Sequence, residues 1–283
     1  MCQSKQRVSA TKRLINHYPH CCFCGGNQPA ETRDHLPPTV FFDGNHRPED
    51  IVVPACTARN VGSRESDRIA AFYSRIGFAE PTRTQRTDFQ KLSKAIRENN
   101  PEIAREWSVD DRRIQQKARF FAHKHGLFCE DDPRAILLGP EAINHLNLFV
   151  HKFTLGLYFH VTKLSVPKNG DVTAAIWPKE VILEKGFPDV ISDIMGPTVI
   201  LKQGKWQTGR QFKYRTARDS ELGFFARMSA FRDAFAVIDV VIHDLRKIDD
   251  RGTRSLFLDP TKLFSILVEN RFKTLQPHNQ LAS

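Results

Sequence analysis

The chain has 283 residues, and at about 150 residues per domain this length predicts roughly two domains. Hydrophobic residues make up 40% and charged residues 26% of the sequence, which is typical of a globular protein and excludes a chain that is disordered throughout. The formal net charge of +10 favours a polyanionic partner such as nucleic acid. Basic side chains that only face solvent would give the same net charge.

The first residues contain basic side chains but no apolar run behind them, so no secretory signal is expected. The apolar stretch at 234–238 is interrupted by Asp239, well short of the ~20 residues that a membrane span requires. Six cysteines, three of them within 21–24, suit metal binding in a reducing compartment better than a disulfide framework. These features predict a cytoplasmic protein with no membrane partner.

Residues 1–80 are rich in Pro and Gly and predict a small, loop-rich module. Its last element is expected to be a helix, capped by Asn60 or Ser63, with apolar side chains at helical spacing up to Ile76. Amphipathic helices are expected to form a connector over 81–130, with a new start at Pro101 and a capping box at 108–111.

Residues 131–283 predict a second unit of unknown role. A helix is expected from Pro140, because apolar residues recur there at steps of three and four as far as Leu157. Strands are expected at 172–177, 198–202, 206, 212–215 and 235–242, and a final helix from Pro260. The predicted fold class is therefore α+β, with a module, a helical connector and a C-terminal α+β unit.

Three short segments within the first 60 residues carry the strongest functional signal. They are Cys21-Cys22-Phe23-Cys24, Arg33-Asp34-His35-Leu36-Pro37-Pro38 and Pro54-Ala55-Cys56-Thr57-Ala58-Arg59-Asn60. Together they resemble the core of the HNH, or ββα-metal, endonuclease family. The resemblance spans about residues 15 to 80. It implies a two-stranded hairpin that ends at the Asp-His pair, a following helix, and paired cysteines that fix the hairpin with zinc.

The resemblance also implies a reaction. His35 would be the general base, and Asp34 and Asn60 would hold a catalytic Mg²⁺ or another divalent cation, because phosphodiester hydrolysis needs a base and a counter-charge for the phosphoryl oxygens. The expected function is metal-dependent endonuclease action on DNA. Taken singly, an Asp-His dipeptide is usually a surface turn, and Asn60 could act as a helix cap.

The cysteines match the zinc pattern incompletely. Structural zinc prefers four Cys or His ligands, and Cys21, Cys24 and Cys56 supply three, because Arg59 stands where the pattern has its fourth cysteine. Cys22, His20 or His17 are alternatives for the fourth ligand. The three sulfurs are expected to lie together with or without metal, since the hairpin needs both of its ends fixed.

A second function from another class stays open. The motif's middle Asn has no clear equivalent here, and Arg59 breaks the second cysteine pair, which favours a nucleic-acid-binding or regulatory protein on an HNH-like scaffold without catalysis. Basic and aromatic residues alternate over 202–215 and could contact phosphates and bases, or form a solvated hairpin. A homo-oligomer assembled through the C-terminal unit is also an expectation.

Overall fold

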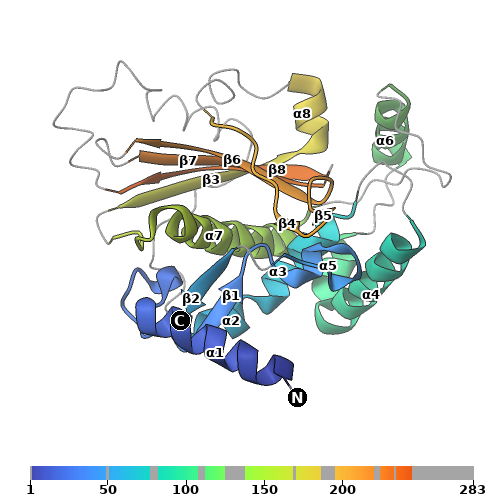
Figure 1. The fold of residues 1–283 in the computed structure, drawn as a ribbon. Coiled ribbons are helices and arrows are strands. Elements are labelled where there is room, and N and C mark those ends of the chain that lie inside the picture. The colour runs from blue at the N-terminus through green and yellow to red at the C-terminus, as the bar shows by residue number, and fades with distance from the viewer. Residues whose placement is uncertain are drawn as a thin grey trace, which may run out of the picture.

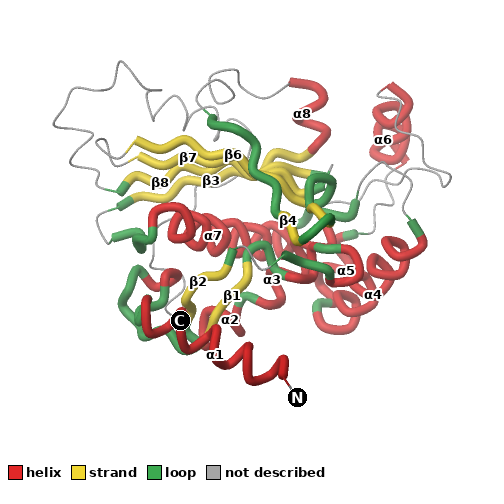
Figure 2. The backbone as a smooth tube through the Cα atoms, in the orientation of Figure 1, coloured by secondary structure: helices red, strands yellow, loops and turns green. Residues whose placement is uncertain are grey.

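The structure is a computed structural model that describes residues 2–48, 51–76, 82–107, 112–124, 138–167, 170–185, 195–219, 224–232 and 234–243. The chain combines helices with small antiparallel sheets. Helices α2 to α7, between residues 57 and 162, and strands β4 to β8, between residues 202 and 242, each follow one another in sequence, so the expected α+β class is confirmed (Figures 1 and 2). Within these residues, no helix combines the length and the apolar character that crossing a membrane requires.

The N-terminal part is built around a short hairpin. Strand β1 pairs antiparallel with β2, and Asp34 lies opposite Val53 in this register. Two short helices follow β2 directly, so a ββα order is present at the position that the motif predicts. The elements are α1 (Cys2–His17), η1 (Cys22–Cys24), β1 (Thr32–His35), η2 (Thr39–Phe41), η3 (Asp43–Asn45), β2 (Val52–Ala55), α2 (Thr57–Gly62) and α3 (Arg64–Tyr73).

Helix α1 was not expected from the sequence, where residues 1–80 predict loops. The segment from Cys2 to His17 contains neither Gly nor Pro and has two Lys, two Arg and two Gln residues, which favour helices. The loop prediction was wrong here because the Gly and Pro residues of this region begin only at Pro19.

The expected connector helices are present as α4 (Arg83–Asn99), α5 (Pro101–Glu106) and α6 (Arg112–Lys124). Pro101 occupies the first position of α5, as predicted. A reciprocal capping box between Thr82 and Gln85 starts α4. The capping box expected at 108–111 lies outside the described residues.

The C-terminal part consists of one long helix and a four-stranded antiparallel sheet in the order β3-β8-β7-β6. The expected strand at 198–202 is largely absent, since only two residues pair as β4 and Val199 makes an isolated bridge to Tyr214. The helix expected from Pro260 lies outside the described residues. The elements are α7 (Pro140–Thr162), β3 (Asp171–Pro178), α8 (Lys179–Lys185), β4 (Lys202–Gln203), β5 (Trp206–Gln207), β6 (Phe212–Asp219), β7 (Phe224–Phe231) and β8 (Phe235–Ile242).

Helix α7 runs between the four-stranded sheet and the N-terminal hairpin (Figure 1). Aromatic packing continues across it: Phe149 of α7 stacks on Phe41 with ring centroids 5.0 Å apart, and Phe231 of β7 lies 5.2 Å from Phe41. One apolar core therefore extends from the hairpin to the sheet. The division into a module, a connector and a C-terminal unit stays a prediction.

A buried ion pair within the sheet also contacts α7. Arg227 of β7 donates through Nε to Oδ1 of Asp239 on β8 at 2.5 Å, and through a second nitrogen to the Thr154 hydroxyl at 3.2 Å. Both charged residues are fully buried. Truncating either one would leave the other charge buried and unpaired. The ion pair therefore links β7 to β8, and the hydrogen bond from Arg227 to Thr154 links the sheet to α7.

Gly156 lets α7 approach the hairpin closely. A Cβ atom at this position would lie 2.1 Å from Cδ1 of Leu36 and 3.1 Å from Cε1 of Phe23, so a larger residue does not fit without movement. Lys152 lies one helical turn earlier on the same face. The close approach at Gly156 therefore brings the Lys152 ammonium to strand β1.

Candidate functional site

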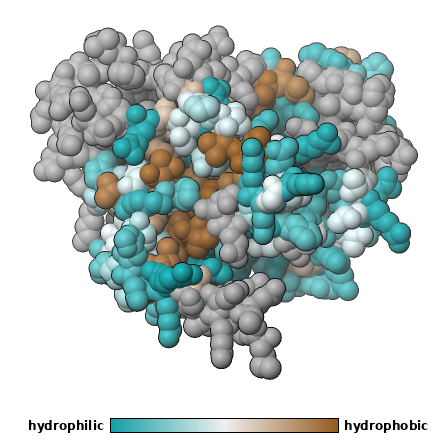
Figure 3. Space-filling view, viewed as in Figure 1, coloured by the Kyte–Doolittle hydropathy of each residue, from teal (hydrophilic) through white to brown (hydrophobic). Residues whose placement is uncertain are grey.

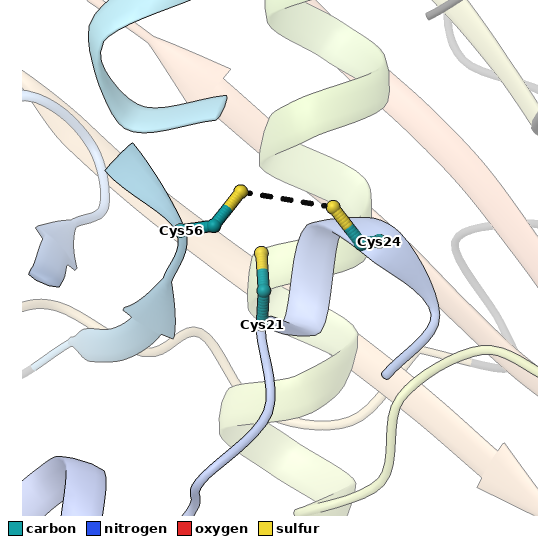
Figure 4. Close-up of side chains that lie close together, drawn as sticks. All are labelled: Cys21, Cys24 and Cys56. Atoms are coloured by element: carbon teal, nitrogen blue, oxygen red, sulfur yellow. Dashed lines mark hydrogen bonds between the residues drawn. The ribbon is translucent and has the colours of Figure 1, made fainter. Parts of the chain in front are cut away.

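Three cysteines from the two ends of the hairpin meet in one cluster (Figure 4). Cys21 precedes η1, Cys24 ends it, and Cys56 follows the last residue of β2. Their sulfur atoms all lie within 4.8 Å of one another, and the sulfurs of Cys24 and Cys56 are 3.8 Å apart. The prediction that these three residues lie together is confirmed.

The cluster has the dimensions of a metal site. Tetrahedral zinc with sulfur ligands at about 2.3 Å places the sulfurs about 3.8 Å apart. Cys21 and Cys56 are buried and Cys24 is half-buried, so metal held there would be shielded on most sides. Burial also raises the pKa of the Cys21 thiol to about 12, which means that ligation would have to displace its proton.

No fourth Cys, His, Asp or Glu joins this cluster within the described part of the chain. Cys22 is fully buried and belongs to the same short helix, while His17 and His20 are exposed. Arg59, which replaces the expected cysteine, lies half-buried in α2. Three protein thiols would leave the fourth position of a tetrahedral ion to a water molecule or another small ligand.

Asp34 points into the protein and is paired there. Its Oδ2 lies 2.8 Å from the Nζ of Lys152, and its Oδ1 accepts a hydrogen bond from the His35 backbone at 2.7 Å. Asp34 and Lys152 are only 8% and 7% exposed. An ammonium from α7 therefore already neutralises the carboxylate that the HNH resemblance assigns to a metal ion.

Asp67 of α3 completes a buried cluster of three charged groups. Its Oδ2 accepts a hydrogen bond from the same Lys152 ammonium at 2.7 Å. Burial raises the pKa of Asp67 to about 6, and Asp34 acts in the same direction while Lys152 opposes it. The two carboxylates together raise the pKa of Lys152 against the effect of its burial, so the lysine stays charged.

His35 follows Asp34 on β1 and is half-buried. The Arg47 guanidinium hydrogen-bonds to its Nδ1, and also donates to the carbonyls of Pro37 at 2.9 Å and Ile51 at 2.8 Å. A guanidinium only donates, so Nδ1 of His35 acts as an acceptor in this contact. That nitrogen is engaged by Arg47 and is not positioned to remove a proton from water.

Asn60 lies in α2 and connects this helix to the hairpin. Its amide nitrogen donates to the Thr32 hydroxyl at 3.0 Å and to the Arg33 carbonyl at 3.3 Å. Asn60 therefore reaches the residues that precede Asp34 on β1. The backbone of α2 begins after Cys56, so Asn60 is inside this short helix and does not cap it.

The Mg²⁺ that the resemblance implies does not fit this arrangement. Its first expected ligand, Asp34, is buried and already paired with a cation, and the Asn60 side chain is bonded to the strand. A divalent ion binds through carboxylate oxygens, and the Lys152 ammonium already lies 2.8 Å from the carboxylate of Asp34. The arrangement of these side chains therefore does not support hydrolysis through an ion held by Asp34 and Asn60.

Lys152 was missed by the sequence analysis, and Asp67 was not among its predicted site residues. A signal for Lys152 existed, because it interrupts the apolar run of α7 between Val150 and Phe153 and all residues from 149 to 159 of this helix are buried. A lysine in such a segment needs a buried counter-charge. The sequence does not reveal which carboxylate provides it.

The chain matches no protein-family model, and it matches neither a curated protein nor a solved structure.

Proposed function

We propose that this protein binds nucleic acid on an HNH-like ββα scaffold, does not hydrolyse phosphodiesters with a metal ion, and holds one zinc ion on Cys21, Cys24 and Cys56. The observation that carries the proposal is the position of Lys152, whose ammonium lies within 2.8 Å of both Asp34 and Asp67. An HNH-type reaction would need the Asp34 carboxylate for its cation.

Support for a nucleic-acid partner comes from the charge and from helix α6. The net charge is +10, and α6 carries five exposed basic residues and no acidic one. The exposed ring of Phe120 lies on the same helix and could stack on a base. The basic residues are Arg112, Arg113, Lys117, Arg119 and Lys124.

The α4 helix offers a comparison within the same molecule. It also bears exposed lysines, Lys91 and Lys94, but Lys94 pairs with Glu98 at 3.8 Å. The positive charge of α6 therefore differs from that of α4 in having no acidic residues within the helix to offset it.

On the face viewed in Figure 3, hydrophilic residues surround smaller hydrophobic groups.

Binding can be tested by fluorescence anisotropy with a duplex DNA and a single-stranded RNA at several salt concentrations. If α6 supplies about four phosphate contacts, the dissociation constant should rise about 100-fold between 50 and 200 mM salt. Replacing Arg112, Lys117 and Lys124 by Ala should flatten this dependence. The matched control, Lys91→Ala with Lys94→Ala, should leave most of it in place.

Cleavage can be tested on supercoiled plasmid with Mg²⁺ or Mn²⁺. We expect binding without nicking for the wild-type protein and for His35→Ala. Nicking by the wild type that disappears in His35→Ala would refute the proposal and establish the second candidate below.

The second candidate is a metal-dependent HNH endonuclease of DNA. It is favoured by the ββα order and by the position of Asn60, whose side chain reaches β1 immediately before Asp34 and His35. This candidate requires Lys152 to leave Asp34 when substrate and metal bind. The nicking assay separates the two candidates directly.

A further inference from the structure

Two buried carboxylates from different elements share a single ammonium. Asp34 comes from β1, Asp67 from α3 and Lys152 from α7, and all three are more than nine-tenths buried. We propose that Asp34 and Asp67 form a latent divalent-cation site, which the Lys152 ammonium occupies and keeps closed. The inference deepens the proposed function, because it names the residue that excludes the metal and a ligand, Asp67, outside the HNH-like motif.

The charges of the cluster favour a doubly charged occupant. Two acidic side chains face a single ammonium in a buried environment. Oδ1 of Asp67 is also buried and has no hydrogen-bond partner among the described residues. Burial of such an atom is unfavourable unless it is paired. A divalent cation would neutralise both carboxylates and could engage this oxygen, whereas the ammonium neutralises only one of them.

The geometry is compatible with a cation in the place of the ammonium. One oxygen of each carboxylate lies 2.7 to 2.8 Å from the same point, the Nζ of Lys152. Divalent ions bind oxygen at about 2.0 to 2.6 Å, so each carboxylate would have to move inward by about 0.5 Å. Shortening residue 152 would leave a polar cavity that water molecules could enter as the remaining ligands.

The cluster also explains why the wild-type protein should not bind a cation there. Two strong attractions hold the ammonium, and the lysine that carries it is buried. A metal ion would have to displace a buried lysine and would leave it unpaired. As long as residue 152 is a lysine, its ammonium therefore occupies the site more favourably than a divalent cation would.

The test uses the full-length protein with its cysteine cluster loaded with zinc, so that added Mn²⁺ does not compete for thiolates. Lys152→Ala and Lys152→Gln are compared with the wild type, because Gln fills part of the space and keeps a hydrogen-bond donor if Ala does not fold. Binding is followed by the loss of the free Mn²⁺ electron paramagnetic resonance signal and by thermal unfolding. The matched control is Lys152→Ala combined with Asp67→Asn, which removes one of the two carboxylates.

We expect about one Mn²⁺ per chain in at least one Lys152 variant, none in the wild type, and at least a tenfold weaker affinity in the Asp67→Asn control. The unfolding temperature of that variant should rise by roughly 5 °C at saturating Mn²⁺. Equal Mn²⁺ binding by the wild type and the variants would show that Lys152 does not keep a divalent cation out of this site. Variants that bind no Mn²⁺, or that fail to fold with or without it, would show that no cation can replace the ammonium.

These outcomes are separate from those of the proposed function. The latent site can be refuted by the Mn²⁺ titration while the wild-type protein still binds nucleic acid without cutting it. Conversely, metal-dependent nicking by the wild type would refute the proposed function, whatever the Lys152 variants bind in the absence of nucleic acid.

Discussion

Replacing Gly156 by Ala tests the packing that brings α7 to the hairpin. The added Cβ would lie 2.1 Å from Cδ1 of Leu36, far inside van der Waals contact. Leu36 is fully buried, so its side chain cannot rotate into solvent to relieve the overlap. Either the leucine takes a strained rotamer or α7 moves away from β1, and the second response would also lengthen the contact between Lys152 and Asp34.

Two opposing effects determine the size of the change. Ala is a better helix former than Gly, which contributes about 0.5 to 1 kcal/mol in favour of the variant. Overpacking a filled core costs about 1 to 3 kcal/mol. Because the overlap with the buried Leu36 is severe, the cost should be about 2 to 3 kcal/mol, which leaves a net loss of stability of about 1 to 2.5 kcal/mol. For a chain of this size that corresponds to a fall of roughly 3 to 6 °C in the unfolding temperature.

Gly62 is a matched control, because it is also helical and a Cβ there would have no atom within 4 Å. Gly62→Ala should be neutral or stabilising by up to about 0.5 kcal/mol. Circular dichroism during thermal and urea unfolding measures both variants. A third comparison places Gly156→Ala in a Leu36→Ala background, where the obstructing atom is absent and the cost should largely disappear.

The packing argument fails if Gly156→Ala is as stable as the wild type or more stable. It also fails if the cost of Gly156→Ala is the same with and without Leu36, because a double-mutant cycle must show coupling between residues that collide.

The metal site and the buried carboxylate give two more predictions. Elemental analysis should find about one zinc per chain. Cys56→Ser should lower the zinc content and the unfolding temperature, and Arg59→Cys should slow the loss of zinc to a chelator. An unchanged zinc content in Cys56→Ser would refute the zinc site. Because burial raises the pKa of Asp67 from 3.8 to about 6, the folded protein holds this proton more tightly than the unfolded chain does. The contribution of Asp67 to stability is therefore complete below pH 3.8 and is lost as the pH rises through 6. Urea unfolding should show the stability of the wild type relative to Asp67→Asn falling between about pH 4 and pH 7, and a constant difference would contradict the assigned burial effect.

Local patterns were sufficient for much of the fold. The steps of three and four from Ile143 to Leu157 predict α7, and the β-branched run at 235–242 predicts β8, because both signals depend on the periodicity of one segment. The cysteine cluster was predictable as well. A Cys-x-x-Cys turn fixes two sulfurs locally, and the hairpin that the Asp-His segment predicts returns the chain to the third, Cys56.

The partners of the motif residues were not predictable in this way. The sequence placed Asp34, His35 and Asn60 near one another, and Asn60 does reach β1. It gave no indication that Arg47 would bond to the His35 ring. The side chains of the motif can be directed either at a solvent-facing ion or at neighbouring protein groups, and the motif has the same spacing in both cases.

The sequence by itself therefore determined the strongly periodic elements, such as α7 and β8, and the meeting of the three cysteines, because each depends on short-range spacing. The cluster of Asp34, Asp67 and Lys152 was decided only by the tertiary structure. Asp67 and Lys152 are separated by 85 residues and meet where α3 packs against α7, whereas Gly156 allows α7 to approach Leu36, next to the strand that carries Asp34. A buried lysine must find a counter-charge, but which carboxylate it finds depends on how distant segments pack, and no local periodicity encodes that.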